Sequence, residues 1–222
     1  MTMNTTTTTT TITTSTIAVL GAGRVGTTLA AGLAAAGHRV TLGVRDPGTA
    51  AARSDASVSA VATAIANSDL VINATPGDGS LERLTGHREA LAGKVLLDVS
   101  NATVRSADGL PGGLLHRDTS LGELLQAALP ATKVVKGLNT MLFSVMTSPG
   151  VLRNPPTAFL SGDDPDAKDL VRTVLSSLGW QDDWVVDLGD ISTARGTEAV
   201  ALLVPSLLGS VGFVPFAIAV AR

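Results

Sequence analysis

Short apolar segments alternate with helix-like segments along most of this chain, and no other feature constrains its fold as strongly. Each apolar segment stops at a glycine, a proline or a polar breaker, and the stretches between have helical composition. The expected strands are Thr16–Leu20, Val40–Val44, Leu70–Ala74, Val95–Val99, Lys133–Leu138, Thr157–Ser161 and Trp184–Leu188. The expected helices are Arg24–Ala36, Ala60–Asn67, Leu81–Leu91, Leu121–Leu129, Pro165–Leu178 and a long one from Ile191, bent at Pro205 and Pro215. Strands that are apolar at successive positions are typical of a parallel sheet covered on both faces, so we predict an α/β protein.

A glycine motif stands between the first expected strand and the first expected helix. Its residues Gly21, Ala22, Gly23, Arg24, Val25 and Gly26 have the spacing G-x-G-x-x-G. In this setting the first glycine permits a tight turn, the second admits a pyrophosphate and the third lets helix and strand pack closely. The start of the helix adds free N–H groups and partial positive charge. We therefore predict that these six residues bind a dinucleotide in a Rossmann-like, doubly wound, mostly parallel sheet; a glycine-rich turn without a ligand is the alternative.

The end of the second expected strand indicates which dinucleotide is bound. NAD enzymes place an acidic residue there to bond the ribose hydroxyls. Here Arg45 offers a planar, charged donor group to a 2′-phosphate, and Arg24 in the glycine turn could approach the same phosphate. Asp46 is the complication, because a shift of one residue would restore an NAD-type carboxylate. We predict NADP(H) as the cofactor.

Composition excludes several kinds of site and partner. The chain has no cysteine, which rules out disulfides and thiolate metal sites and makes a reducing cytoplasm the expected location. Its three histidines are far apart, so no metal site is expected. With 16 basic residues, 19 acidic residues and no basic block, the chain is not expected to bind nucleic acid.

The two ends of the chain differ in character from the part between them. Eleven of the first sixteen residues are threonine, so residues 1–15 are expected to form a flexible tail, followed by an NADP-binding domain over residues 16–190. The final segment, residues 191–222, includes 23 uncharged residues from Ala199 to Ala221. That length would suit a membrane helix, but Pro205, Pro215 and the missing aromatic belt argue against a membrane span. We expect instead an apolar helix that closes the site and is buried against a second subunit of a homodimer.

Further segments extend the glycine motif into a family resemblance. They are Ile17–Gly26, Gly37–Val40, Gly43–Pro47, Val134–Thr140, Phe159–Asp164, Ala167–Lys168, Val186–Gly189 and Arg195–Glu198. In this order, over residues 16–222, they resemble the NADP-dependent oxidoreductases that reduce coenzyme F420. The same domain is similar to the NADPH-oxidising part of certain metalloreductases and to a family of imine or carbonyl reductases.

The resemblance implies a Rossmann-type fold with two appended strands, a C-terminal helix near the active site and a homodimer. It also implies hydride transfer between NADP(H) and a deazaflavin (coenzyme F420), a flavin or a small organic acceptor. Asn139, Thr140 and Met141 would surround the acceptor and the nicotinamide, at a place where the F420-reducing subgroup tends to carry a histidine. The acceptor therefore stays open, with imine or carbonyl reduction and a non-catalytic NADP(H)-binding redox sensor as alternatives.

Single residues at other strand ends complete the predicted site. Thr75 and Pro76 end the third expected strand, at the edge where ligands bind in open α/β sheets, and are expected to contact the ribose or nicotinamide. Asn101 is expected to orient the nicotinamide amide.

Four charged or titratable residues are expected to have structural roles. Asp98 is expected to be a buried structural acceptor, and Lys136 to form a salt bridge or be solvated. His38 is expected at the surface, and Glu198 is expected to stabilise the start of the apolar terminal helix through the helix dipole.

Overall fold

A mixed sheet forms the centre of the protein. The computed structural model describes residues 14–48 and 56–221, so most of the predicted threonine-rich tail, residues 1–13, lies outside the described residues. Within them, eight strands form one sheet in the order β10-β9-β8-β5-β4-β1-β2-β3. The strands are β1 Thr16–Leu20, β2 Arg39–Val44, β3 Ser57–Ala60, β4 Leu70–Asn73, β5 Val95–Asp98, β8 Lys133–Gly137, β9 Ala158–Ser161 and β10 Val185–Asp187. The predicted α/β, mostly parallel sheet is confirmed.

The strand order is that of a doubly wound dinucleotide-binding sheet with two strands added. In the part of the sheet with the order β8-β5-β4-β1-β2-β3, all neighbouring strands are parallel. Strand β1 lies at its centre, between β2 and β4. Strand β9 is antiparallel to β8, and β10 is parallel to β9. Because the chain leaves β1 on one side and later returns to β4 on the other, a crevice opens at the carboxyl ends of these strands.

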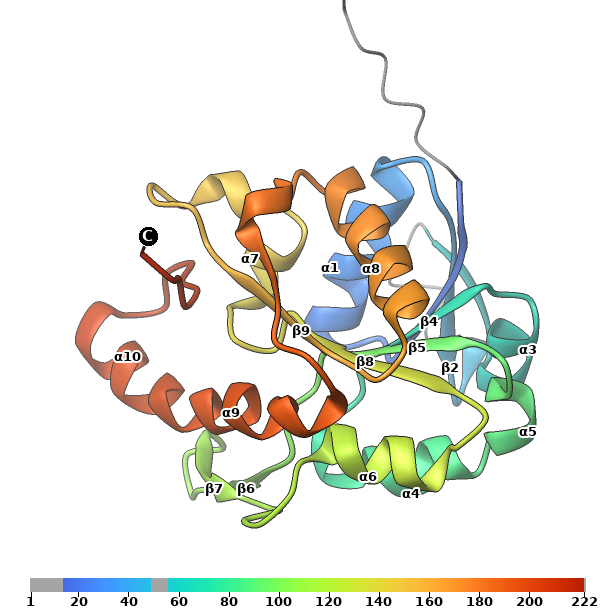
Figure 1. Cartoon of the computed structure of the whole chain (residues 1–222), viewed down its shortest axis with the longest axis horizontal. Helices are drawn as coiled ribbons and strands as arrows, with labels where there is room; N and C mark the ends of the chain where they lie inside the picture. Colours follow the sequence, from blue (N-terminus) through green and yellow to red (C-terminus); the bar gives the residue numbers. More distant parts are fainter. Residues whose placement is uncertain (1–13, 49–55, 222) are drawn as a thin grey trace, which may run out of the picture.

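Both faces of the sheet are apolar and covered. In β1, Ile17 and Val19 belong to one buried cluster, whereas Ala18 and Leu20 belong to the other, as the two-residue period of a strand requires. The first face is covered by α1 Arg24–Ala35, α7 Phe143–Met146 and α8 Pro165–Ser177. The second face is covered by α3 Val61–Ala66, α4 Ser80–Thr85, α5 Arg88–Leu91 and α6 Leu121–Ala128 (Figure 1). The prediction of a sheet covered on both faces, made from strands that are apolar at successive positions, is therefore confirmed.

Three local features differ from the sequence predictions. Strand β3 was not predicted, nor was a two-stranded hairpin of β6 Thr103–Arg105 and β7 Pro111–Leu114. These strands are short, polar or glycine-containing, and only partly buried, so no apolar pattern marks them. The single helix expected over Leu81–Leu91 is two helices, α4 and α5, separated at Gly86 and His87.

The terminal segment is helical over a shorter range than predicted. It contains the 3-10 turn η4 Ile191–Thr193, helix α9 Ala194–Ala199, the 3-10 turn η5 Val200–Leu203 and helix α10 Val204–Val211. The helix ends at Gly212, whose φ of +77° is left-handed and therefore incompatible with a continuing helix. The predicted helix bend at Pro215 is wrong, because residues 213–221 are not helical and return to pair with residues 140–142 and 157. Among the described residues, no helix is long and apolar enough to cross a membrane.

His38 is buried, so its predicted surface position is wrong. Its Nδ1 atom accepts a hydrogen bond from the backbone N–H of Ser15 at 3.2 Å, and its Nε2 lies 2.8 Å from the hydroxyl of Ser177. Burial lowers the pKa of His38, which favours the neutral ring that this pairing requires. The residue links the start of β1 to the end of α8, and the sequence carries no local sign of this contact.

Candidate active-site cleft

A cleft of about 900 Å³ opens at the carboxyl edge of the sheet, where the strand order reverses beside β1. Twelve of the thirteen predicted site residues line it: Gly21, Ala22, Gly23, Arg24, Val25, Arg45, Thr75, Pro76, Asn101, Asn139, Thr140 and Met141. Gly26 lies behind the wall, buried under the turn. Residues that are 120 positions apart in the sequence therefore meet in one cavity, as the doubly wound order predicts.

The three motif glycines have different surroundings, and each explains one part of the turn. Gly21 has a φ of +105°, and an added Cβ would lie 2.9 Å from the carbonyl oxygen of Ala74. At Gly26 a Cβ would lie 1.9 Å from the carbonyl oxygen of Gly21, so only glycine lets α1 approach the turn. A Cβ added at Gly23 would have no neighbouring atom within 4 Å, so the space above the start of α1 is open for a phosphate group. The turn thus fits a dinucleotide pyrophosphate.

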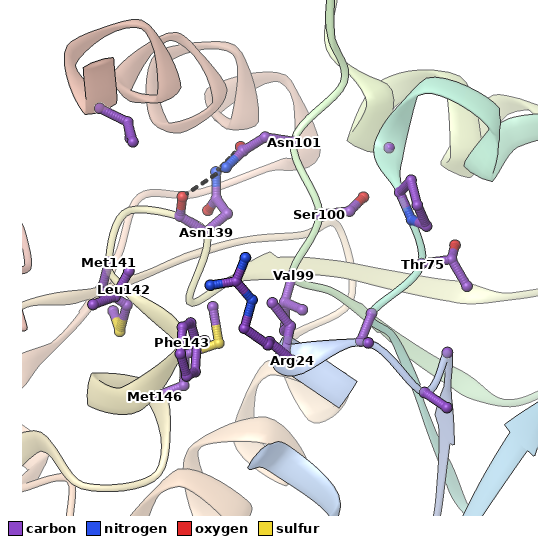
Figure 2. A pocket seen from close by; sticks show the side chains of 18 of the residues that line it. Arg24, Thr75, Val99, Ser100, Asn101, Asn139, Met141, Leu142, Phe143 and Met146 are labelled. Atoms are coloured by element: carbon purple, nitrogen blue, oxygen red, sulfur yellow. Dashed lines mark hydrogen bonds between the residues drawn. The ribbon is translucent and has the colours of Figure 1, made fainter. Parts of the chain in front are cut away.

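Two arginines line the cleft at different places: Arg45 follows β2, whereas the Arg24 side chain lies on the side of Phe143 (Figure 2). Arg45 directly follows β2, is exposed and lines the cleft. Arg24 at the start of α1 lies with its guanidinium carbon 5.9 Å from the centre of the Phe213 ring, within cation–π range. The Asp46 carboxylate also lines the cleft, but its Oδ1 accepts a hydrogen bond from the Gly48 N–H at 3.1 Å. Arg45 therefore offers a charged donor to a 2′-phosphate, while one oxygen of Asp46 is already bonded to its own turn.

The turn after β4 is held by a buried asparagine. The Asn73 Oδ1 atom accepts hydrogen bonds from the Thr75 hydroxyl at 2.6 Å and from the Thr75 N–H at 3.2 Å. The Asn73 amide nitrogen donates to Asp98 Oδ1 at 2.8 Å, which ties the ends of β4 and β5 together. A Cβ at Gly77 would lie 2.3 Å from the carbonyl oxygen of Asn101, so this turn also packs tightly against the loop after β5. Thr75 and Pro76 are therefore presented to the cleft on a rigid turn.

Two asparagines join the loops that follow β5 and β8. The Asn101 amide nitrogen donates to the backbone carbonyl of Asn139 at 2.9 Å, and the Asn139 amide nitrogen donates to Asn101 Oδ1 at 3.0 Å (Figure 2). Since a backbone carbonyl can only accept, this pairing fixes the orientation of both amides. Leu138, just before Asn139, has a φ of +59°, a left-handed conformation that is costly for leucine and that turns the chain into the cleft.

The far end of the cleft is apolar, and most of its residues were not predicted. Figure 2 shows Met141, Leu142, Phe143 and Met146 together on one side, with Thr75 and Ser100 on the other. The unpredicted lining residues include Arg83, Arg105, Leu142, Phe143, Met146, Val200, Val204, Leu207 and Phe216. The last four belong to the terminal segment, whose return is fixed by hydrogen bonds to residues 140–142 and 157. The terminal segment was expected near the site, but its apolar sequence does not indicate which of its residues line the cleft.

The returning residues 213–221 lie alongside the loop after β8. The Leu142 N–H donates to the carbonyl of Phe216 at 2.9 Å, and the Ile218 N–H donates to the carbonyl of Thr140 at 3.1 Å. Phe213 lies against Phe143 with ring centres 6.5 Å apart, and it also approaches Arg24. The terminal segment therefore contacts both the loop after β8 and Arg24 of the glycine turn.

A buried ionic cluster lies behind the strand ends. The Lys136 ammonium forms ion pairs with Asp98 and Glu198, both at 2.8 Å, and Lys136 and Asp98 have no exposed side-chain surface. Burial alone would lower the pKa of Lys136, but the two carboxylates outweigh it and the net shift is upward, so the ammonium is charged. The predicted ion pair of Lys136 and buried acceptor role of Asp98 are confirmed. The prediction for Glu198 is wrong: its carboxylate caps α6, not its own helix.

The fold and the cleft define a dinucleotide-binding oxidoreductase, and comparison with known proteins agrees. The family model described as NADP oxidoreductase coenzyme F420-dependent matches residues 16–102. A candidate F420-dependent NADP reductase from Arthrobacter sp. FB24, known from its crystal structure, is 43% identical. That alignment covers 94% of this chain and 100% of the other, with a TM-score of 0.85.

Two other solved structures are similar at lower identity. A hypothetical protein from Sinorhizobium meliloti is 30% identical over 81% of this chain and 87% of its own, with a TM-score of 0.64. An imine reductase from Streptomyces aurantiacus shares the fold at 22% identity and a TM-score of 0.60, over 87% of this chain and 61% of its own. No protein with curated annotation matches this chain significantly.

This chain belongs to the F420-dependent NADP oxidoreductase family and is an NADP-dependent oxidoreductase. The expected family is confirmed, and so is the expectation of an enzyme in place of a non-catalytic sensor. The cleft also retains room beside Asn139 and Met141, beyond the glycine turn, as an enzyme with a second substrate requires.

Proposed function

We propose that this enzyme transfers a hydride between NADP(H) and a planar, flavin-like acceptor, with coenzyme F420 or a flavin as the first candidates. The observation that supports this proposal is a single cleft that runs from the glycine turn to an apolar wall of methionine and phenylalanine side chains. Such a wall suits one face of an aromatic ring system. Hydride transfer demands mainly that two ring faces be held close together with water excluded.

The cofactor supplies the hydride, and the residues of this chain bind and orient it. The N–H groups at the start of α1 would receive the pyrophosphate above Gly23, where the space is open. Arg45 would neutralise the 2′-phosphate, whereas the Arg24 guanidinium lies against Phe213 and would have to move to reach it. Thr75, Pro76 and Asn101 would contact the ribose and the nicotinamide, whereas Asn139, Thr140 and Met141 would face the acceptor.

Two hydroxyl groups beside the cleft already donate their protons within the protein, which favours an acceptor that needs no proton from them. Thr75 donates its hydroxyl proton to Asn73, and Ser100 donates its hydroxyl proton to Asp98 at 2.7 Å. An alkoxide or amide anion made by reducing a carbonyl or imine must be protonated at once, whereas a flavin-like ring can hold the added charge. Reduction of an imine or carbonyl is therefore the second candidate function.

Steady-state oxidation of NADPH against a panel of F420, FMN, a quinone and a cyclic imine tests the proposal. We expect F420 or FMN to be reduced faster than the imine, and NADH to replace NADPH poorly. The Gly23→Val variant is the control, since it removes the cofactor and should abolish turnover with every acceptor. Turnover of the imine alone would overturn the flavin-like acceptor in favour of the second candidate, and no turnover with any acceptor would overturn both.

We also propose that residues 191–222 form part of a homodimer interface in a cytoplasmic enzyme. Leu202, Leu203, Val211 and Phe213 are all exposed on the terminal segment, and a second copy of the chain would cover them. Sedimentation at micromolar concentration should give a dimer, and Leu203→Asp should give a monomer. Val104→Asp is the control, because Val104 is equally exposed, at 52% against 51%, but lies on β6. A monomeric unmodified protein would contradict the proposal.

A further inference from the structure

Arg195 and Glu198, the first and last residues of the Arg195–Glu198 motif, form hydrogen bonds with the start of α6. The Arg195 guanidinium donates to both carboxylate oxygens of Glu123, at 2.6 and 2.7 Å. The Glu198 carboxylate accepts hydrogen bonds from the N–H groups of Leu121 at 3.0 Å and Gly122 at 3.1 Å. These N–H groups have no partner inside their own helix, and the positive end of the helix dipole favours a carboxylate there. Both residues connect α9 to α6, but the Glu198 side chain is 6% exposed and the Arg195 side chain 55%, so we expect Glu198 to carry most of the docking.

Glu198 is also the outer member of the buried ionic cluster. The Lys136 ammonium has three donors and three acceptors: Asp98 Oδ2, Glu198 Oε1 and the carbonyl oxygen of Ser100. Asp98 is in turn satisfied by Asn73 and by the N–H and hydroxyl of Ser100. Because each charge is paired and buried, the loss of one partner would leave another uncompensated in the interior.

Both ends of this cluster connect to residues that line the cleft. Lys136 and Asp98 hold Ser100, and the next residue, Asn101, is paired with Asn139 on the acceptor side. On the other end, Glu198 is followed within nine residues by Val200, Val204 and Leu207, which line the cleft. Figure 1 shows the terminal helices passing both α6 and the β6–β7 hairpin. We call Val200, Val204 and Leu207 the terminal wall of the cleft. Because they follow Glu198 on the same helical segment, the position of this wall depends on where Glu198 is held.

We propose that Glu198, through its ion pair with Lys136, is a positioning residue that sets the terminal wall of the cleft and thereby the affinity for the acceptor. The role in acceptor binding rests on the proposed function, whereas the docking of the terminal segment does not. Neither side chain touches the ligands, because Lys136 has no exposed surface and Glu198 very little. The two parts of the proposal can be measured separately.

The docking part is tested by thiol labelling, for which the absence of cysteine gives a clean background. A cysteine at Ala201, which is buried in η5 and 2% exposed, reports on the terminal segment. In the otherwise unmodified protein this thiol should react slowly with a thiol-specific reagent. Adding Glu198→Gln should accelerate its labelling about tenfold or more, as expected when local opening becomes easier. A cysteine at Ala158, buried in β9, is the control and should stay protected in both backgrounds.

The binding part is tested by steady-state kinetics and cofactor titration on Glu198→Gln without the cysteine. The acceptor KM, measured with FMN or F420, should rise about tenfold, while the Kd for NADPH should change by less than about twofold. Arg195→Ala is the matched control. It lies one turn away on α9 and removes an ion pair whose arginine is 55% exposed, so both values should change little.

The outcomes separate the two proposals. Unchanged labelling of the Ala201→Cys thiol in the Glu198→Gln background would overturn the positioning role, whatever the acceptor is. An equal acceleration of labelling at positions 201 and 158 by Glu198→Gln would also overturn it, because that result would show global destabilisation. Faster labelling at position 201 with no turnover by the unmodified enzyme would support the docking and overturn only the proposed function. A parallel rise in acceptor KM and NADPH Kd would overturn the specific link to the acceptor.

Discussion

The two halves of the cleft are built in different ways. The cofactor half depends on one continuous turn, Gly21–Gly26, in which single backbone contacts within a few residues decide the geometry. The acceptor half is assembled from the loops after β5 and β8 and from the terminal segment, which are joined by the Asn101–Asn139 pair and the Lys136 cluster. The geometry of the first half is held by local steric contacts, whereas the geometry of the second half is held by buried charged and polar groups.

This difference indicates how each half could diverge. The steric requirement for glycine at Gly21 and Gly26 allows almost no substitution, so the shape of the cofactor turn is tied to the fold itself. The acceptor wall instead consists of interchangeable apolar side chains held by a polar cluster behind them. Such a wall can accommodate different acceptors while the cluster keeps its position. Four substitutions test this contrast, from the largest expected effect to the smallest.

Lys136→Ala should cause the largest loss of stability. It leaves the buried carboxylates of Asp98 and Glu198 without their cation, a change that costs about 3–5 kcal/mol in comparable buried ion pairs. Urea unfolding of both proteins measures the loss. Lys133→Ala is the control, since the Lys133–Asp164 pair is partly exposed and should contribute far less. Equal losses for the two variants would show that the cluster is not the anchor of the acceptor half.

Gly23→Val should remove cofactor binding but leave the fold intact. The added side chain enters the open space above α1, where the pyrophosphate would lie, and we expect at least about a hundredfold weaker NADPH binding, or about 2.7 kcal/mol. Gly26→Ala should instead destabilise the protein, because its Cβ meets the Gly21 carbonyl. Fluorescence titration and thermal unfolding separate the two effects. Tight NADPH binding by Gly23→Val would place the cofactor elsewhere.

Arg45→Ala should weaken NADPH binding selectively. A charge-assisted contact with the 2′-phosphate contributes about 1.5–3 kcal/mol, so the Kd should rise roughly tenfold to a hundredfold. NADH has no 2′-phosphate, and its Kd should change little. Titration of the variant with both cofactors measures the ratio. An equal loss for NADPH and NADH would mean that Arg45 does not contact that phosphate.

What the sequence predicts correctly also differs between the two halves of the cleft. The seven apolar strands of the large sheet, the glycine turn and the positions of Thr75 and Asn101 follow from local patterns, namely apolar runs and the residues that end them. The short strands β3, β6 and β7 do not, because they carry no apolar run. The partners of Glu198 do not, because Leu121 lies 77 residues away and no local pattern relates the two. The terminal segment was misjudged for a related reason: its apolar run gave no sign that Gly212 ends the helix and that the rest of the chain pairs with residues 140–142.

Arg195→Ala should have the smallest effect, and its pH dependence identifies the cause. Arg195 is the main reason that the pKa of Glu123 is lowered from 4.5 to about 2, opposed by desolvation and assisted by Ser120. A carboxyl group with a lowered pKa adds stability that is complete above pH 4.5 and is lost as the pH falls toward about 2. The difference in unfolding free energy between the unmodified protein and Arg195→Ala should therefore be constant near neutrality and shrink across that acidic range. Because Arg195 is largely exposed, added salt should reduce the difference further. A difference that persists unchanged at pH 2 would show that Arg195 stabilises α9 by packing and not by its charge.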